Sequence, residues 1–297
     1  MNVFITGGAG YIGTALCDAL DALPQIDQIT VFDALSRGDR RFFLRSQPYS
    51  KVRFVHGNVL DGRQVAQASR GHDVAVHLAA FVDEPYHHSQ HVQYEQVNGF
   101  GTLSVVRALE ASPDLKRAIY LSSTAVYGFR ADLTVDSDPA PENGYGVSKL
   151  LGEQYFAQLR HADKEVHVLR SGQVFGPNRS MRFDTVVHAF FFEALTNGRI
   201  AVHGDGKQSR AFAALPDVVD ALVARVMGAE APALLASFQA AIQELLHWMT
   251  GQIPSIEYRY LSPNIALPSQ TFQHLPGLNP AALQSAWDDF IQSSAIR

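Results

Sequence analysis

The segment Val3-Phe4-Ile5-Thr6-Gly7-Gly8-Ala9-Gly10-Tyr11-Ile12-Gly13 decides the fold of this chain. A short apolar run leads into four glycines, and an amphipathic helical pattern follows them. Glycines permit a tight turn and let backbone N–H groups approach a pyrophosphate at the positively polarised start of a helix. The residues expected to contact a dinucleotide here are Gly7, Gly10, Tyr11, Ile12 and Gly13.

The rest of the first half repeats this alternation of strand and helix. Nearly continuous apolar runs predict buried parallel strands at 3–5, 29–32, 52–55, 74–78, 118–121 and 166–169. Helical patterns lie between them at 13–23, 64–69, 98–111 and 145–160. The alternation predicts an α/β fold with a doubly wound parallel sheet, the Rossmann architecture.

After Gly172 the pattern changes to loops rich in Gly and Pro, with helical patterns at 217–227, 238–250 and 280–292. We therefore expect two regions, a dinucleotide-binding domain of residues 1–172 and a smaller substrate-binding lobe of residues 173–297, interleaved with the first. The lobe is expected to cover the carboxyl edge of the sheet, where open α/β folds bind ligands.

Composition excludes several classes of function. The net charge of −5 gives no electrostatic case for binding nucleic acid or an anionic membrane surface. No apolar stretch has the roughly 18 residues of a membrane span, and the N-terminus shows no secretory leader pattern. With one cysteine, Cys17, no intrachain disulfide can form. These features predict a cytoplasmic protein with a small-molecule substrate.

Asp33 stands at the end of the second predicted strand. A carboxylate there accepts hydrogen bonds from the ribose hydroxyls of NAD and repels the 2′-phosphate of NADP. Arg37 follows closely, so some tolerance of NADP stays open, and a turn or capping role is the alternative for Asp33.

The ends of the third and fourth strands also point toward the cofactor. These ends are His56-Gly57-Asn58-Val59 and His77-Leu78-Ala79-Ala80. Asn98 opens the following helical pattern and has two interpretations. It supports the helix backbone and a proton-relay water, or it caps the helix.

Tyr145 and Lys149 are four residues apart in a helical pattern, so they share one helix face. A free tyrosine has a pKa near ~10. A neighbouring ammonium and the positive nicotinamide ring favour the phenolate. Tyr145 is therefore a candidate general acid or base, with Lys149 as its partner.

Three hydroxyls, those of Ser122, Ser123 and Thr124, compete for a place beside Tyr145 at the end of the fifth strand. Their spacing to Tyr127-Gly128 favours Ser123, and capping of the strand end is the other interpretation.

Together these residues resemble the extended short-chain dehydrogenase/reductase superfamily, in particular its NAD-dependent epimerase/dehydratase group acting on nucleotide sugars. Further motifs carry the resemblance. They are Asn98 with Gly101-Thr102, Val174-Phe175-Gly176-Pro177, and Gly204-Asp205-Gly206-Lys207-Gln208-Ser209-Arg210.

The resemblance implies that NAD stays bound while Tyr145 takes a proton from a sugar hydroxyl and hydride moves to the nicotinamide. Reduction of the keto intermediate from its other face then gives an epimer. Catalysis falls to Ser123, Tyr145 and Lys149. By the same resemblance, the cofactor is bound by Asn58 and Val59 (at the adenine), Leu78, Ala79, Ala80, Asn98 and Ser122. The substrate is bound by Ser123, Thr124, Gln173 and Arg210, and a homodimer forms through the helices at 98–111 and 145–160.

The sequence departs from these relatives in two places. Thr124-Ala125 follow Ser123 where dehydratases carry Asp-Glu and decarboxylases a Glu, so both reactions are disfavoured and a 4-epimerase is favoured. Gly228 to Pro232 lead almost directly into the pattern at 238–250, and no late arginine stands at 268–272, which predicts a lobe shortened on the nucleotide side. A reductase or dehydrogenase using NAD(P) on another small molecule, and a non-catalytic NAD-binding protein, stay as alternatives.

A loop after the fourth strand gathers Tyr86, His87, His88 and His91 over the expected pocket. They either touch substrate or form a solvated loop. They do not make a metal-ligand set, so we expect no metal.

Overall fold

Seven parallel strands form the central sheet, in the order β10-β6-β5-β4-β1-β2-β3. The computed structural model describes residues 1–38, 40–82 and 91–293. The strands are β1 (Asn2–Thr6), β2 (Gln28–Asp33), β3 (Val52–His56), β4 (Val74–His77), β5 (Arg117–Ser123), β6 (Glu165–Ser171) and β10 (Leu234–Leu235). The six strands predicted for the first half are confirmed. The strand order reverses between β1 and β4, which is the switch point where such sheets bind ligands.

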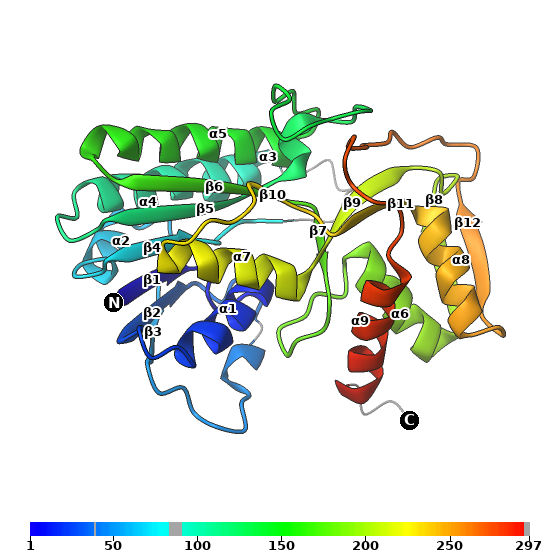
Figure 1. Ribbon diagram of the computed structural model, residues 1–297, viewed down its shortest axis with the longest axis horizontal. Coiled ribbons are helices and arrows are strands. Elements are labelled where there is room, and N and C mark those ends of the chain that lie inside the picture. The colour runs from blue at the N-terminus through cyan, green and yellow to red at the C-terminus, as the bar shows by residue number, and fades with distance from the viewer. Residues whose placement is uncertain (39, 83–90, 294–297) are drawn as a thin grey trace.

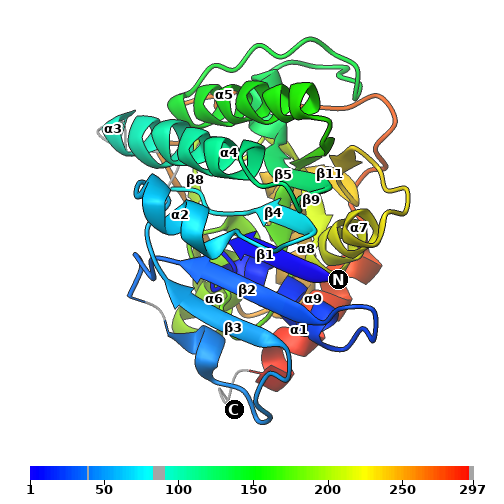
Figure 2. The same cartoon turned by 90° about the vertical axis from the view of Figure 1, so that its left-hand side faces the viewer.

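Helices cover both faces of this sheet, as Figure 2 shows. On one face lie α1 (Tyr11–Asp21) and α7 (Leu215–Met227), and on the other lie α2 (Gly62–Ala68), α4 (Thr102–Glu110) and α5 (Gly144–Gln158). Val3 and Ile5 pack with α1 and α7, whereas Phe4 between them packs with α4 and α5. Because successive side chains of a strand point to opposite faces, the buried strand β1 contributes to the hydrophobic core on each face of the sheet.

The helix predicted at 98–111 is two structures rather than one. A π-helical turn, η2 (Tyr94–Gly101), follows the short α3 (His91–Gln93) and precedes α4. Asn98 therefore lies inside a helical turn and does not cap a helix. Single π turns are rare and are found mostly at functional sites.

A second lobe packs beside the carboxyl edge of the sheet (Figure 1). Its helices are α6 (Val186–Asn197), α8 (Ile242–Gln252) and α9 (Pro280–Ser293). Its strands are β7 (Gln173–Phe175), β9 (Ser209–Ala214) and β11 (Phe238–Ala241) in one small sheet, and β8 (Arg199–His203) and β12 (Glu257–Leu261) in another. Its core is rich in aromatic side chains, including Phe191, Phe212, Phe238 and Trp287. Because β10 and α7 pack with the large sheet, the two regions interleave.

The start of α8 differs from the prediction made from the sequence. The prediction of one helix over 238–250 is wrong in its first turn, because 238–241 pair antiparallel with β9. The expected direct passage from Gly228–Pro232 into that helix is also wrong, since β10 and β11 both intervene. Gln239 is half-buried between the buried Phe238 and Ala240, as in a strand, and the buried Ala241 is also the N-cap of α8.

None of the helices within the described residues has the length and apolar character that a bilayer span requires.

The glycine-rich turn is packed too tightly for side chains. A Cβ on Gly7, whose φ is +72°, would stand 2.5 Å from the Ala79 nitrogen at the end of β4. A Cβ on Gly13 would stand 2.5 Å from both the Gly7 oxygen and the Gly8 Cα. At Gly7 and Gly13 the turn therefore packs backbone against backbone, which brings α1 close to the end of β4.

We predict that Gly13→Ala lowers the free energy of unfolding by about 1–3 kcal/mol, because the obstructing atoms are backbone and the turn itself must move. NAD affinity should fall with it. Gly251→Ala is the matched control, since Gly251 is helical and a Cβ there would meet no atom within 4 Å. It should be stabilising by about 0.5–1 kcal/mol. Urea unfolding of both variants checks this, and equal stability of the Gly13 variant and the unaltered protein would contradict it.

Candidate active site

The first turn of α1 offers an open cradle of backbone donors. Gly10 is its N-cap and provides no side-chain cap. The N–H groups of Tyr11, Ile12 and Gly13 therefore have no partner within the helix. Phosphate oxygens are the natural ligands of such a terminus. The turn thus fits a dinucleotide pyrophosphate.

Asp33 lies beside this turn at the end of β2. Its Oδ2 accepts from the Ala9 nitrogen at 3.0 Å and its Oδ1 from the Leu35 nitrogen at 2.8 Å. Burial raises the pKa of this carboxyl, and the two backbone bonds oppose the rise. Each oxygen retains a lone pair for a ribose hydroxyl. Asp33 therefore both shapes the turn and fits the ribose of NAD.

Arg37, whose position left some tolerance of NADP open in the sequence analysis, contacts other parts of the protein. Its guanidinium donates to the Val82 carbonyl at 2.8 Å and lies 3.5 Å from Asp184 of the lobe. These contacts span the loops after β2 and β4 and reach the lobe. The arrangement favours NAD, because Asp33 would repel a 2′-phosphate.

The ends of β3 and β4 adjoin the same turn. Leu78 donates through its backbone N–H to the Thr6 carbonyl at 3.0 Å, and Ala79 and Ala80 follow, half-buried. Asn58 is exposed and forms an Asx turn, its Oδ1 accepting from the Leu60 nitrogen at 3.0 Å. The next residue, Val59, is buried.

Asn98 links three elements rather than capping one. Its amide accepts from the Phe81 N–H at 2.7 Å and donates to the Phe81 carbonyl at 3.0 Å and to Ser148 Oγ at 3.0 Å. It thereby fixes the end of β4 against α5. The capping interpretation is replaced by a role in holding the site together.

Beneath the site His77 is fully buried between two hydroxyls. Thr6 Oγ1 lies 2.5 Å from Nδ1 and Thr102 Oγ1 lies 2.9 Å from Nε2. Burial, with the Lys149 charge in addition, lowers the pKa of His77 to about 3. The ring is therefore neutral and joins β1 to α4.

Ser123, Tyr145 and Lys149 meet at the carboxyl end of β5. The Ser123 hydroxyl lies close enough to the Tyr145 phenol to act on its pKa, and the Lys149 ammonium donates to the Leu121 carbonyl at 2.7 Å. The same ammonium lies 4.8 Å from the centre of the Tyr120 ring. The structure thus brings together the triad predicted from sequence.

Burial and neighbouring groups shift the pKa values of Tyr145 and Lys149. Burial raises the pKa of Tyr145 to about 12, while Arg182 and the Ser123 hydrogen bond act to lower it and Tyr94 adds to the rise. Burial lowers the pKa of Lys149 to about 8, opposed by the Glu153 carboxylate. The rise in the Tyr145 pKa is opposite to the fall expected from a neighbouring ammonium, because desolvation of the buried phenol outweighs the groups that act to lower it.

The other two residues of the β5 end contact neighbouring parts of the protein, Ser122 through its hydroxyl and Thr124 through its backbone carbonyl. Ser122 Oγ donates to Glu153 at 2.6 Å. Thr124 is buried, and its carbonyl accepts from the Gln270 amide at 2.8 Å. The Gln270 amide also donates to the Gly128 carbonyl at 2.7 Å. In a cofactor contact the Ser122 hydroxyl would therefore accept rather than donate a hydrogen bond.

Gln173 and Arg210 line the lobe side. Gln173 begins β7 and is half-buried. The Arg210 guanidinium donates to the Ser209 and Pro268 carbonyls at 2.8 and 2.7 Å and stacks 4.9 Å from the centre of the Phe129 ring. The segment around Pro268, where no late arginine stands, thus holds the arginine of β9 in place.

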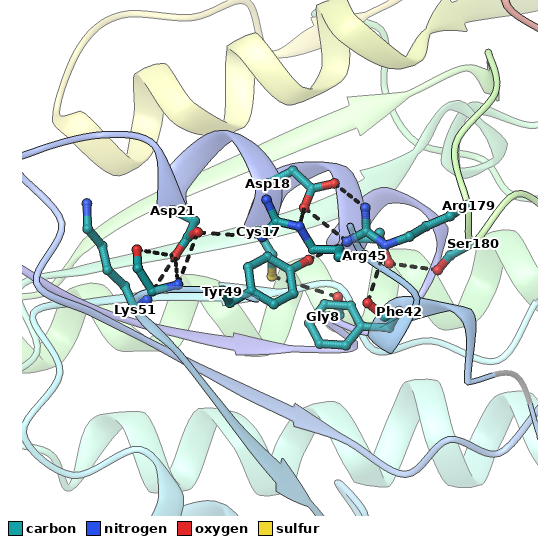
Figure 3. Close-up of polar contacts among 12 residues, drawn as sticks. Gly8, Cys17, Asp18, Asp21, Phe42, Arg45, Tyr49, Lys51, Arg179 and Ser180 are labelled. Atoms are coloured by element: carbon teal, nitrogen blue, oxygen red, sulfur yellow. Dashed lines mark hydrogen bonds and ion pairs between the residues drawn. The ribbon is translucent and has the colours of Figure 1, made fainter. Parts of the chain in front are cut away.

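Sequence reasoning missed the residues that bind the lobe to α1. The Tyr11 hydroxyl donates to the Gly176 carbonyl, and Asn178 donates to the Tyr11 carbonyl at 2.7 Å. Figure 3 shows the adjacent contacts, where Arg179 of the lobe forks onto Asp18 of α1 at 2.6 and 3.0 Å. These contacts come from the loop at 176–179, whose Gly-Pro-Asn-Arg sequence has no helical or strand periodicity. Its position against α1 therefore could not be predicted from the sequence.

Two further residues near Tyr145 were also missed. The Tyr94 ring of the π turn lies 6.0 Å from the Tyr145 ring, centre to centre. Arg182, whose charge reaches Tyr145, forks onto Asp184 at 2.9 and 2.6 Å. Tyr86, His87 and His88 lie outside the described residues, as does the side chain of His91.

The fold and this geometry define a class: a Rossmann-type dinucleotide-binding protein with a Ser-Tyr-Lys site at the edge of its sheet. A model of the NAD dependent epimerase/dehydratase family matches residues 3–231. The chain belongs to that family, as its resemblance to extended short-chain dehydrogenases predicts.

Individual relatives agree with this assignment. The chain is 28% identical over 238 residues to an uncharacterised UDP-glucose epimerase, YtcB, of Bacillus subtilis, covering 75% of this chain and 72% of that one. It is 29% identical to a UDP-glucose 4-epimerase of Mycolicibacterium smegmatis, with the same coverage. The fold of a UDP-glucuronic acid 4-epimerase from Bacillus cereus superposes with a TM-score of 0.84 at 22% identity, covering 99% of this chain and 100% of that one.

The neutral, buried His77 predicts a pH dependence of stability. Its pKa is about 3 in the fold and near ~6.5 when unfolded. Below about pH 6.5 the unfolded chain binds a proton that the fold does not, so stability falls by up to about 1.4 kcal/mol per pH unit as pH drops. His77→Asn should weaken the protein at pH 7.5 and flatten its loss of stability between about pH 6.5 and 5.

Urea unfolding at several pH values measures this slope. His274→Asn is the control, because His274 is exposed and should leave the slope unchanged. Equal slopes for the His77 variant and the unaltered protein would show that another group causes the acid sensitivity.

Proposed function

We propose that the protein is an NAD-dependent nucleotide-sugar epimerase that inverts C4 of its sugar. The observation that carries this proposal is the meeting of Ser123, Tyr145 and Lys149 beside the dinucleotide cradle of α1. Relatives described as a UDP-glucose epimerase and as a UDP-glucose 4-epimerase support the substrate class.

The residues divide the chemistry between them. Bound NAD would accept hydride from the sugar carbon and return it. Tyr145 takes the proton of the sugar hydroxyl and gives it back after the ring presents its other face. Ser123 hydrogen-bonds the same oxygen, and Lys149 supplies the positive charge that favours the phenolate. Proton and hydride both return, so no net redox change occurs.

The cofactor and substrate contacts follow from the same proposal. The α1 turn holds the pyrophosphate, Asp33 the adenosine ribose, Asn58 and Val59 the adenine edge, and 78–80 with Ser122 the nicotinamide side. Asn98 supports that side through Phe81 and Ser148. The nucleotide sugar is bound by Thr124, Gln173 and Arg210.

The residues after Ser123 favour epimerisation over elimination. Dehydration needs an acid to protonate the departing hydroxyl, and neither the aliphatic hydroxyl of Thr124 nor the methyl group of Ala125 can act as one. Epimerisation requires no such group. The site therefore fits a reaction that begins and ends with an intact sugar.

The activity test uses the purified full chain without added cofactor. Acid release and chromatography should find NAD bound to the protein. Incubation with UDP-glucose, UDP-glucuronic acid or UDP-N-acetylglucosamine should yield the matching 4-epimer by NMR. Accumulation of NADH with a keto product, and no epimer, would instead indicate a dehydrogenase. If none of these sugar nucleotides is converted, the proposal is wrong.

We expect Tyr145→Phe to lower kcat by about 10²–10⁴-fold, because it removes the proton-transferring oxygen, while NAD stays bound. Tyr155→Phe, further along the same helix, is the control and should retain full rate. Both are measured in the epimer assay. A Tyr145 variant that retains full rate would remove Tyr145 from the mechanism.

We also propose a homodimer formed through the layer of α4 and α5. Two large apolar side chains are exposed on this side of the molecule. Phe100 of η2 is 59% exposed and Val147 of α5 is 52% exposed. The helices are the outermost layer in Figure 1, and α5 packs directly on η2. A second copy would cover both side chains.

The double variant Phe100→Glu/Val147→Glu should therefore be monomeric in light scattering coupled to gel filtration. Burying two carboxylates in an apolar interface is unfavourable. Phe192→Glu, on the exposed side of α6, should leave the dimer intact. A monomeric unaltered protein would refute the proposed dimer.

A further inference from the structure

Two side chains of α5, one turn apart, are anchored to consecutive residues of β5. The Lys149 ammonium donates to the Leu121 carbonyl at 2.7 Å, and the Glu153 carboxylate accepts from the Ser122 hydroxyl at 2.6 Å. Residues four apart on a helix are neighbours, with Cβ atoms about 5–6 Å apart. Glu153 thus lies one turn from Lys149 on the same face of α5, and its charge acts on the ammonium.

Glu153 is itself held in one orientation. Arg170 of β6 forks onto its two oxygens at 2.9 and 2.7 Å. The Glu153 side chain is 10% exposed and that of Arg170 is 18% exposed. The Arg170 guanidinium also stacks 4.7 Å from the centre of the Tyr127 ring. A forked pair this enclosed leaves the carboxylate little rotational freedom.

The groups that face Lys149 and Tyr145 come from several elements and differ in charge. The groups that act on Lys149 are His77 of β4, Tyr120 of β5 and Glu153 of α5. Those that act on Tyr145 include Tyr94 of η2 and Arg182 of the lobe. Arg170 of β6 pairs with Glu153 and stacks on Tyr127, which ends the short 3-10 helix Thr124–Tyr127. His77 and Tyr120 are neutral, because burial opposes their charged forms and shifts the pKa of each accordingly. Within the described residues, Glu153 is the anion that acts on Lys149.

We propose that Glu153 is a positioning residue that keeps Lys149 charged in its buried site, with Ser122 and Arg170 holding the carboxylate in place. The functional consequence rests on the proposed function, in which the ammonium favours the Tyr145 phenolate. Burial already brings the pKa of Lys149 down to about 8. Without the neighbouring carboxylate the ammonium would lose its proton within the neutral range, and the pH at which the rate depends on Lys149 would move to lower values.

The titration of Lys149 can be measured directly, without substrate. The chain has five lysines, Lys51, Lys116, Lys149, Lys164 and Lys207. With lysine labelled at ¹³Cε, NMR of the full chain should show one resonance titrating well below the others, which Lys149→Met assigns. We expect Glu153→Gln to lower the Lys149 midpoint by about one pH unit.

Arg170→Met is the matched control, because it breaks the same ion pair but retains the carboxylate. It should leave the Lys149 midpoint unchanged or raise it. Should Glu153→Gln fail to fold, Glu153→Gln/Arg170→Met removes both charges, avoids an uncompensated buried ion, and should lower the midpoint in the same way.

An unchanged midpoint after loss of Glu153 would overturn the proposal. So would an equal lowering in Arg170→Met, since that would trace the effect to packing rather than charge. Because the titration needs no sugar nucleotide, its outcome is independent of the epimer assay. A lowered midpoint in a protein without epimerase activity would refute the proposed function and keep the role of Glu153.

Discussion

The hydrogen bond from the Lys149 ammonium to the Leu121 carbonyl is the contact on which the site depends. It fixes α5 over the carboxyl end of β5. Once α5 is placed, Tyr145 lies one turn earlier on the same face, within reach of Ser123. Gly152, whose added Cβ would meet the Tyr120 hydroxyl oxygen, allows this close approach of helix and strand.

Placing an ammonium in this position is unfavourable, and the surrounding polar groups compensate for it. Desolvation opposes the charge on Lys149 and lowers its pKa. The Tyr120 ring face, the Leu121 carbonyl and the Glu153 carboxylate each stabilise it. His77 nearby stays neutral and engages both ring nitrogens with threonine hydroxyls, so it adds no second positive charge.

Local sequence signals predicted the parts of the molecule that have a fixed period or spacing. The six strands, the glycine turn and the Tyr145–Lys149 pair each follow from residues close together in the chain. The Glu153–Arg170 fork and the Gln270 amide at Thr124 join distant segments, so no local pattern announces them. The strand at 238–241 was misread because its four residues, three of them buried, lie directly before α8 and extend its apolar pattern.

Tyr11 shows why the two regions of the chain act as one site. Its backbone N–H belongs to the phosphate cradle of α1, while its hydroxyl binds the Gly176 carbonyl of the lobe. The Gly176 N–H in turn donates to His188 at 3.0 Å, and the other ring nitrogen of His188 donates to the Arg182 carbonyl at 2.7 Å. Arg182 is the lobe residue whose charge reaches Tyr145 and acts to lower its pKa. A chain of hydrogen bonds thus runs from the glycine turn through the lobe to Arg182, so a displacement of the lobe relative to α1 would change the distance from this charge to Tyr145.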